Sequence, residues 1–176
     1  GLSQTRVAQI VQDDQGFIWL GTQHGLNRFD GYEFRMLVHD TRQPESIGAV
    51  FVTALFKDRD NKIWVGGAQT LDWLDPVTEA VRHVSLVEGI PGADIPTVVH
   101  IAQDSSGAMW FATGSGLFRR DPVNEGITRF QHDPADPGSL PSNDVRFSGQ
   151  DSRGDFWVGT TRGLDRFDPL SGRVTL

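Results

Sequence analysis

The sequence predicts an all-β protein that consists of four consecutive four-stranded antiparallel β-propeller blades. Four of the five tryptophans recur at separations of 45, 46 and 47 residues. Each lies in a short apolar run that follows a turn signal beginning with aspartate, and a second turn and a half-apolar run come directly after it. A unit of about 40 to 50 residues with an aromatic anchor and several short strands is typical of a propeller blade. The anchors are Trp19, Trp64, Trp110 and Trp157.

The composition agrees with a folded chain of strands and turns. With 38% apolar and 10% aromatic residues in 176, the chain can form a sizeable core. Its 20 glycines and 9 prolines suit a protein that turns back on itself every eight to twelve residues or so. No segment shows the capped, three-and-four periodic pattern of a helix, so no helix is required.

Charge and residue types exclude several classes of function. The net charge is −7 and there is no basic run, so we expect no nucleic-acid binding. The absence of cysteine excludes disulfides, cysteine-ligated zinc and thiol catalysis. No apolar run is long enough to span a bilayer, so we expect no direct membrane contact in this segment. Because the chain begins with Gly1 and shows no signal peptide, we expect a processed product or a piece of a longer protein.

Each unit begins with a strand whose apolar residues lie at the same two offsets before the tryptophan. The fourth unit has Ser148 at the second offset, so its first strand is predicted to be the least regular. The apolar pairs of the first three units are Val7 and Ile10, Val52 and Leu55, and Val98 and Ile101.

The tryptophan strand comes second in each unit, and a tight turn leads from it to the third strand. Glycine follows this turn in three units, at Gly25, Gly116 and Gly163, whereas the second unit has Thr70. Because glycine alone turns without steric cost, we expect the second unit to turn less tightly. The third strands are predicted over 25–29, 70–74, 116–119 and 163–167.

A more polar fourth strand completes each unit, and long connections then lead to the next. The outer strands are predicted over 32–38, 80–86, 127–132 and 173–176, half exposed, with the two inner strands buried between blades. The connections cover 40–49, 87–95 and 133–143. We therefore divide a single propeller segment, 1–176, into blades at about 1–40, 41–87, 88–133 and 134–176.

The repeat resembles a known family. Residues 7–30 carry Val-x-x-Ile-x-x-Asp-x-x-Gly-Phe-Ile-Trp-Leu-Gly-Thr-x-x-Gly-Leu-Asn-Arg-Phe-Asp, which is similar to the two-component regulator propeller repeat. Residues 139–145, Ser-Leu-Pro-Ser-Asn-Asp-Val, resemble that family's entry into a new blade, and residues 1–4 resemble the start of its first blade. In bacteria the family forms the sensor half of hybrid two-component histidine kinases and of some diguanylate cyclases.

The resemblance implies a ligand-sensing segment in the periplasmic or extracytoplasmic part of an inner-membrane protein. Its partners would be a small-molecule or oligosaccharide ligand and the remaining blades of a longer parent sensor, with no catalysis and no cofactor in this segment. Two alternatives stay open: an enzyme like the streptogramin lyase propellers, and a scaffold propeller that binds proteins.

Metal binding and catalysis have no support in the residue pattern. The turn aspartates lack the bidentate glutamate of a calcium loop, and an aspartate that caps its own turn explains all four copies. The five histidines share no ligand spacing. We therefore predict no metal site and no catalytic residues.

Ligand selectivity is predicted to lie in residues that interrupt the repeat at loop tips. Packing fixes the repeated positions, so variable side chains at the mouth of the propeller axis are left to recognise a ligand. Ala68 and Thr161 lie in these turns, and His24 has no counterpart in the other units. The candidate ligand-binding residues are Gln4, Arg6, Gln23, His24, Gln69, Ser115, Arg146 and Arg162.

Four blades alone would leave two apolar blade faces uncovered. Exposed apolar faces of this size are uncommon in monomers. We therefore expect the isolated segment to self-associate through them.

Overall fold

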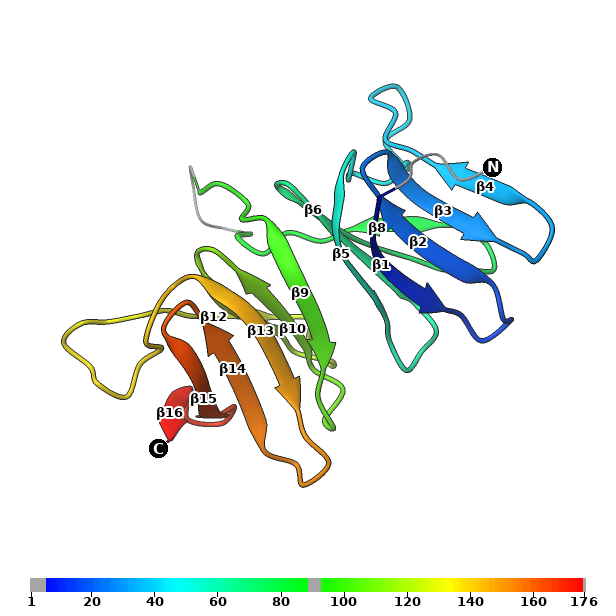
Figure 1. Cartoon of the computed structure of the whole chain (residues 1–176). Coiled ribbons are helices and arrows are strands. Elements are labelled where there is room, and N and C mark those ends of the chain that lie inside the picture. Colours follow the sequence, from blue (N-terminus) through cyan, green and yellow to red (C-terminus); the bar gives the residue numbers. More distant parts are fainter. Residues whose placement is uncertain (1–5, 89–92, 176) are drawn as a thin grey trace. The chain divides into compact units, whose positions relative to one another are not determined.

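The computed structural model describes residues 6–88 and 93–175, which form sixteen strands and no helix. The strands make four antiparallel four-stranded sheets, each of which follows the chain order (Figure 1). This confirms the predicted fold class. The bounds are β1 Val7–Gln12, β2 Ile18–Thr22, β3 Gly25–Phe29 and β4 Phe34–Leu37 in blade 1; β5 Val52–Lys57, β6 Ile63–Gly67, β7 Thr70–Leu74 and β8 Val81–His83 in blade 2; β9 Val98–Gln103, β10 Met109–Thr113, β11 Gly116–Arg120 and β12 Ile127–Phe130 in blade 3; and β13 Val145–Gln150, β14 Phe156–Thr160, β15 Gly163–Asp168 and β16 Arg173–Thr175 in blade 4.

The chain divides into two compact units, at residues 1–98 and 99–176. The first unit contains blades 1 and 2, and the second contains blades 3 and 4, with the boundary inside β9. The division of 1–176 as a single propeller segment with the four residue ranges given above stays a prediction.

The turn before each tryptophan strand is built around its first aspartate. In blade 3, Asp104 Oδ1 accepts the backbone N–H groups of Ser106 and Ala108, at 2.9 and 3.1 Å. Its other oxygen accepts the indole N–H of Trp110 at 2.8 Å. The same carboxylate therefore shapes the turn and orients the anchor. The equivalent indole bonds are Trp19 to Asp13 at 2.7 Å, Trp64 to Asp58 at 2.8 Å and Trp157 to Asp151 at 3.1 Å.

The inner strand of blade 4 is not irregular, contrary to the prediction from Ser148. β13 is six residues long, like β1 and β5, and its bulge between Val145 and Phe147 matches the bulges of those strands. Ser148 keeps the inward position and is fully buried, although its hydroxyl has no hydrogen-bond partner. Backbone pairing with β14 therefore holds this strand in register without the usual apolar side chain.

The prediction of a looser turn at Thr70 is also wrong. Gly67 pairs with Thr70, so the β6–β7 turn has two residues, as in the other blades. Without a glycine at its end, the left-handed conformation falls on Gln69, whose φ is 60°. A turn residue thus takes over the strain that glycine carries elsewhere.

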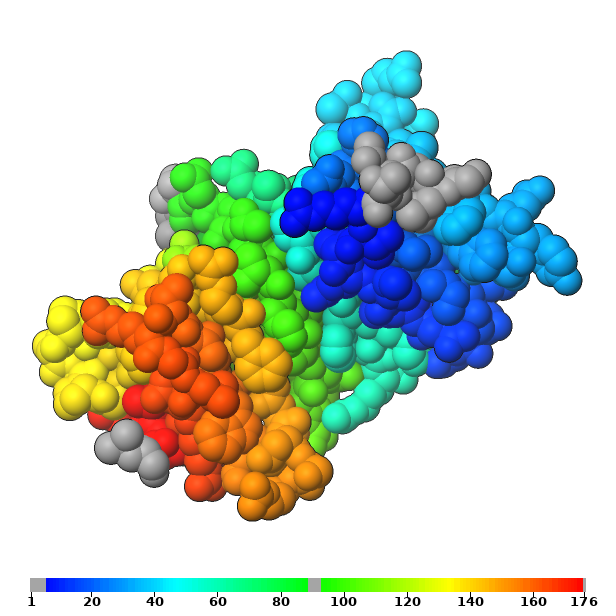
Figure 2. Space-filling model, viewed as in Figure 1, coloured from blue at the N-terminus to red at the C-terminus, as the bar shows by residue number. Residues whose placement is uncertain are grey.

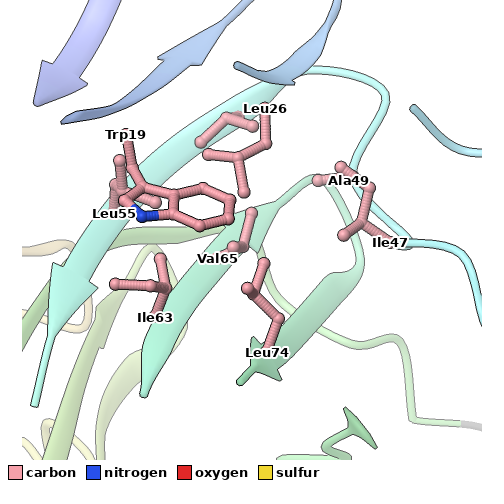
Figure 3. Close-up of a cluster of buried hydrophobic side chains, with 9 residues drawn as sticks. Trp19, Leu26, Ile47, Ala49, Leu55, Ile63, Val65 and Leu74 are labelled. Carbon is pink, nitrogen blue, oxygen red and sulfur yellow. The ribbon is translucent and has the colours of Figure 1, made fainter. Parts of the chain in front are cut away.

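Trp19 anchors the core of the first unit. Its indole is fully buried against blade 2, beside Leu55, Ile63 and Val65 (Figure 3). Ile47, from the connection between the blades, closes the same cluster. Burying an indole removes roughly 150–250 Å² from water, which corresponds to roughly 4–6 kcal/mol. Anchors therefore pack between blades, as the sequence predicts.

Trp110 anchors the second unit in the same way. Its ring lies 4.4 Å from the ring of Phe156 and 6.0 Å from that of Phe167, both in blade 4. Phe130, on the outer strand of blade 3, stacks on Trp110 at 5.8 Å and also contacts the Phe167 ring at 5.2 Å. The cluster has more aromatic rings than that of the first unit, and Leu140 from the connection closes it as Ile47 does there.

The outer strands are shorter and wetter than the inner ones. β4, β8, β12 and β16 have three or four residues and contain no buried position. The half-exposed character was predicted, but the predicted ranges were longer. β8 and β12 are short because they extend only as far as their pairing with the third strand of the blade.

Two connections between blades form the same closed loop. In the first, Asp40 N–H donates to Ser46 Oγ at 3.0 Å, and the Ser46 hydroxyl donates back to the Asp40 carbonyl. Asp133 and Ser139 repeat both contacts in the second unit, at 2.9 and 3.0 Å. Each loop stands out from its own unit, as Figure 2 shows in cyan at 40–46 and in yellow at 133–138.

Candidate ligand-binding site

The first unit brings two of the candidate residues together. Val7 pairs with Thr22, so the start of β1 and the β2–β3 turn lie at the same end of blade 1. Arg6 and Gln23 line a cavity of about 340 Å³ at this end, with Val7, Ala8, Phe51 and Thr53 as the other walls. The side chains therefore come from both blades of the unit.

The cavity offers three kinds of contact. Arg6 is exposed and can donate hydrogen bonds to hydroxyl or carboxylate oxygens. The amide of Gln23 can both donate and accept. Phe51, which is 40% exposed, offers an aromatic face, whereas the Thr53 hydroxyl is already committed to the Val98 carbonyl at 2.6 Å. This set suits a polar organic molecule with an apolar side.

His24 lies at a different cavity, of about 370 Å³. Its Nδ1 meets the Gln23 carbonyl at 2.9 Å, and its backbone N–H donates to Thr22 Oγ1. The cavity is mainly apolar, with His39 as its second imidazole. Sequence reasoning missed its walls because they belong to the outer strand and to the connection: Met36, Val38 and Val50.

Gln69 lines neither cavity. It is exposed at the tip of the β6–β7 turn. Gln4 lies outside the described residues. Of the candidates in the first unit, the structure therefore groups Arg6 with Gln23 and places His24 and Gln69 elsewhere.

The candidates of the second unit differ in the hydrogen bonds and ion pairs that they form within the protein. The Ser115 carbonyl accepts two hydrogen bonds from the Arg129 guanidinium, at 3.1 and 2.7 Å. Arg146 forms an ion pair with Asp144 at 2.7 Å. Arg162 is exposed at the tip of the β14–β15 turn, where its backbone N–H donates to Thr160 Oγ1. Arg162 thus presents a solvated guanidinium, whereas Arg146 must leave Asp144 to reach a ligand.

His100 is a residue that the sequence did not single out. It lies on β9 with its ring 4.9 Å from that of Phe147, and its Nδ1 is buried without a hydrogen-bond partner. Burial lowers the pKa of His100 below its ordinary value, which favours the neutral imidazole. No spacing pattern could have revealed it, because the signal is the burial itself.

Over residues 6–88 and 93–175, no three histidine, aspartate or glutamate side chains are grouped closely enough to hold a metal ion. The same residues contain no helix of the length and hydropathy needed to cross a membrane.

Four-stranded meanders whose tryptophans pack on the following sheet are the blades of a β-propeller. Residues 1–24 and 46–69 match the model of the two component regulator propeller family. The resemblance inferred from the sequence is thereby confirmed for these two stretches, which match two-component regulator propeller repeats.

Histidine kinase P4 of Formosa agariphila is 45% identical to this chain over 47 residues, which are 27% of the chain and 3% of the kinase. The extracellular domain of a protein described as a one component system of B. thetaiotaomicron has a TM-score of 0.78 at 22% identity, over 97% of this chain and 23% of its own. A catalytically inactive virginiamycin B lyase from Staphylococcus aureus, with quinupristin, has a TM-score of 0.70 at 13% identity, over 99% of this chain and 56% of its own. The two structural likenesses show the fold, and this chain spans a small part of the kinase and of the extracellular domain.

Proposed function

We propose that this chain is a ligand-sensing, extracytoplasmic propeller segment of a bacterial two-component signal-transduction protein, with no catalysis of its own. The observation that carries the proposal is the family repeat itself, which matches at residues 1–24 and 46–69. The sequence relative is a histidine kinase, and one structural relative is an extracellular domain. Both relatives support a sensor whose output domain lies in another part of the parent protein.

The cavity at Arg6 and Gln23 supports a small-molecule or oligosaccharide ligand. A guanidinium and an amide can bind hydroxyl-rich molecules, and the exposed Phe51 ring can pack on the apolar face of a sugar. Loop tips on a rigid scaffold are where binding residues concentrate. The chain is in this view one propeller segment, 1–176, whose missing blades belong to the parent.

The test uses the complete sensor region of the parent protein. Its melting temperature is measured with a panel of oligosaccharides and small metabolites, since a ligand of the native state raises it by mass action. For a ligand found in this way, the double variant Arg6→Ala, Gln23→Ala should weaken binding at least about tenfold, or about 1.4 kcal/mol.

Arg42→Ala is the matched control. Arg42 is 86% exposed and pairs only locally with Asp40, so its removal should leave the dissociation constant unchanged. Equal binding by the double variant and the wild type would reject this cavity as the ligand site. A panel without any stabilising compound would count against ligand sensing.

A further inference from the structure

The two units have corresponding interfaces between blades, and one difference between them lies in the turn before the last strand of each unit. In the first unit, Glu79 in the β7–β8 turn reaches back to blade 1. Its two carboxylate oxygens meet Arg28 at 2.9 Å and Arg35 at 2.7 Å. The Glu79 side chain is only 15% exposed, so this carboxylate is built into the interface.

Gly172 occupies the place of Glu79 in the second unit. Both residues have a left-handed backbone, with φ of 58° and 73°. Both donate their N–H to the carbonyl of the aspartate that starts the turn, Asp75 at 2.7 Å and Asp168 at 2.8 Å. The backbone is therefore conserved between the two turns, while the carboxylate is not.

The arginine that faces this place is retained. Arg28 pairs with Trp19 across the strands, and Arg119 pairs with Trp110 in the same way. Within residues 6–88 and 93–175, Arg119 forms an ion pair with Asp121 of its own blade, at 3.6 Å. That distance is longer than a charge-assisted hydrogen bond. Arg119 thus lacks the cross-blade carboxylate that Arg28 has.

A cavity of about 600 Å³ lies where the carboxylate is missing. It is lined by Arg119, Thr128, Phe130, Ser106, Ser171 and six further residues of blades 3 and 4, besides Asp168. A Cβ on Gly172 would come within 2.6 Å of the Phe130 ring. The Phe130 ring therefore leaves no room for a side chain at position 172. A larger residue there could fill the cavity only if the ring moved.

The two aspartates of the cavity wall are already hydrogen-bonded within the protein. Asp104 binds its turn and Trp110. Asp168 accepts from the Leu170 N–H at 2.9 Å and from the Ser171 hydroxyl at 2.7 Å. These bonds keep the carboxylates in place and leave the serine oxygens able to accept a hydrogen bond. The cation of the cavity is Arg119.

We propose that this cavity binds the carboxylate of a small hydroxylated acid, of which a sugar acid is the simplest example. Arg119 holds the ligand carboxylate as Arg28 holds Glu79, because a guanidinium pairs with a carboxylate through parallel hydrogen bonds. The hydroxyls of Thr128, Ser106 and Ser171 meet the hydroxyl groups, and the Phe130 ring packs on the apolar side. The site lies in the second unit and shares no residue with the candidate ligand-binding residues, so it is independent of the proposed function.

The probe is glucuronate, with glucose as the neutral ligand of matched size, and binding to residues 1–176 is measured by calorimetry and by NMR titration. Glucuronate should bind at least about tenfold more tightly than glucose. Arg119→Gln should weaken glucuronate binding at least about tenfold. Arg28→Gln, the equivalent change in the first unit, removes an ion pair but leaves this cavity intact, and should bind glucuronate as the wild type does.

A second variant covers the case in which Arg119→Gln fails to fold. Thr128 occupies the place of Arg35, because Thr128 pairs with Arg119 across the strands as Arg35 pairs with Arg28. It is exposed, so Thr128→Arg should fold and should bind glucuronate several-fold more tightly. The proposal is overturned if glucose and glucuronate bind equally, if neither binds, or if both variants bind glucuronate as the wild type does.

Discussion

Single residues in this protein carry two roles at once, and the turn aspartates are the clearest example. Each one caps its own turn with one oxygen and binds the anchor indole with the other. In blade 4 the hydrogen bond from Trp157 is the main reason that the pKa of Asp151 is lowered from its ordinary value. The sequence predicted the cap but not the indole contact, because a spacing of six residues across a turn does not show which way two side chains point.

Replacing Asp104 should therefore be costly. Asp104→Ala leaves the buried indole N–H and two backbone N–H groups without an acceptor, and each such loss costs roughly 1–3 kcal/mol. We expect the free energy of unfolding to fall by about 2–4 kcal/mol, since the backbone groups can partly rebind water. Urea denaturation measures it.

Asp151→Ala is the comparison. Trp157 is only partly buried, and its indole bond is longer, at 3.1 Å. Water can replace the lost acceptor there, so the loss should be smaller than for Asp104→Ala. Equal losses for the two variants would mean that the turn, and not the indole contact, accounts for the effect.

At the level of elements, the two closed connections are fastened to the outer strand by different chemistry. In the second unit, Arg173 of β16 binds Asp136 in the loop at 2.8 and 2.6 Å. In the first unit, His83 of β8 binds the Pro44 carbonyl of the loop at 2.6 Å and the buried Asp72 at 2.5 Å. The same loop is thus held by a permanent cation in one unit and by a titratable group in the other.

The histidine contact should make the first connection sensitive to pH. The bonds to Pro44 and to Asp72 raise the pKa of His83 above 6.5. A histidine whose pKa is raised by folding stabilises the folded state. This contribution is complete at pH values below the pKa of the unfolded state and is lost as the pH rises through the pKa of the folded state. We expect the protection of the amides of residues 45–48 against hydrogen exchange to fall at alkaline pH, beyond the intrinsic pH dependence of exchange.

Two comparisons test the origin of that change. In His83→Gln the exchange at residues 45–48 should be fast at both pH values, because no imidazolium forms. The loop at 133–139, held by Arg173, should show no added change beyond the intrinsic pH dependence of exchange. An equal change in both loops would contradict the role of His83.

Strand positions could be predicted because they depend on a local pattern that the chain repeats. Apolar alternation and turn residues located β3 and β7 to the residue. The cavity at Arg119 could not be predicted, because it depends on which side chain of a neighbouring blade reaches across the interface. Glu79 and Gly172 occupy the same turn position, and only the packed structure shows that one fills a space that the other leaves open.

For the whole molecule, the two terminal blades each have one uncovered apolar face. Ile10 in blade 1 is 61% exposed, whereas its equivalent in blade 2, Leu55, is 5% exposed. Leu164 in blade 4 is 63% exposed, whereas Leu117 in blade 3 is fully buried. Both faces carry residues of the kind that neighbouring blades cover inside each unit. In the proposed parent sensor, these faces would contact the remaining blades.

In the isolated segment these faces should pair with each other. We expect the mass measured by light scattering to rise above the 19.4 kDa monomer as the concentration increases, because exposed apolar patches drive association. Leu164→Glu should shift this association to higher concentration by about tenfold or more.

Val123→Glu is the control, because Val123 is 89% exposed in the β11–β12 turn and belongs to neither face. It should associate as the wild type does. A segment that stays monomeric over the whole concentration range would show that these faces do not pair.

The direction of anchor packing has a consequence for biosynthesis. Trp19 is covered by blade 2, and Trp110 is covered by blade 4, so the anchor of each of these blades is buried by residues that leave the ribosome later. A nascent chain therefore presents a ready apolar surface to each sheet that emerges next. For blades 1 and 3 we therefore expect the sheet that is synthesised next to fold against the anchor of the sheet that precedes it.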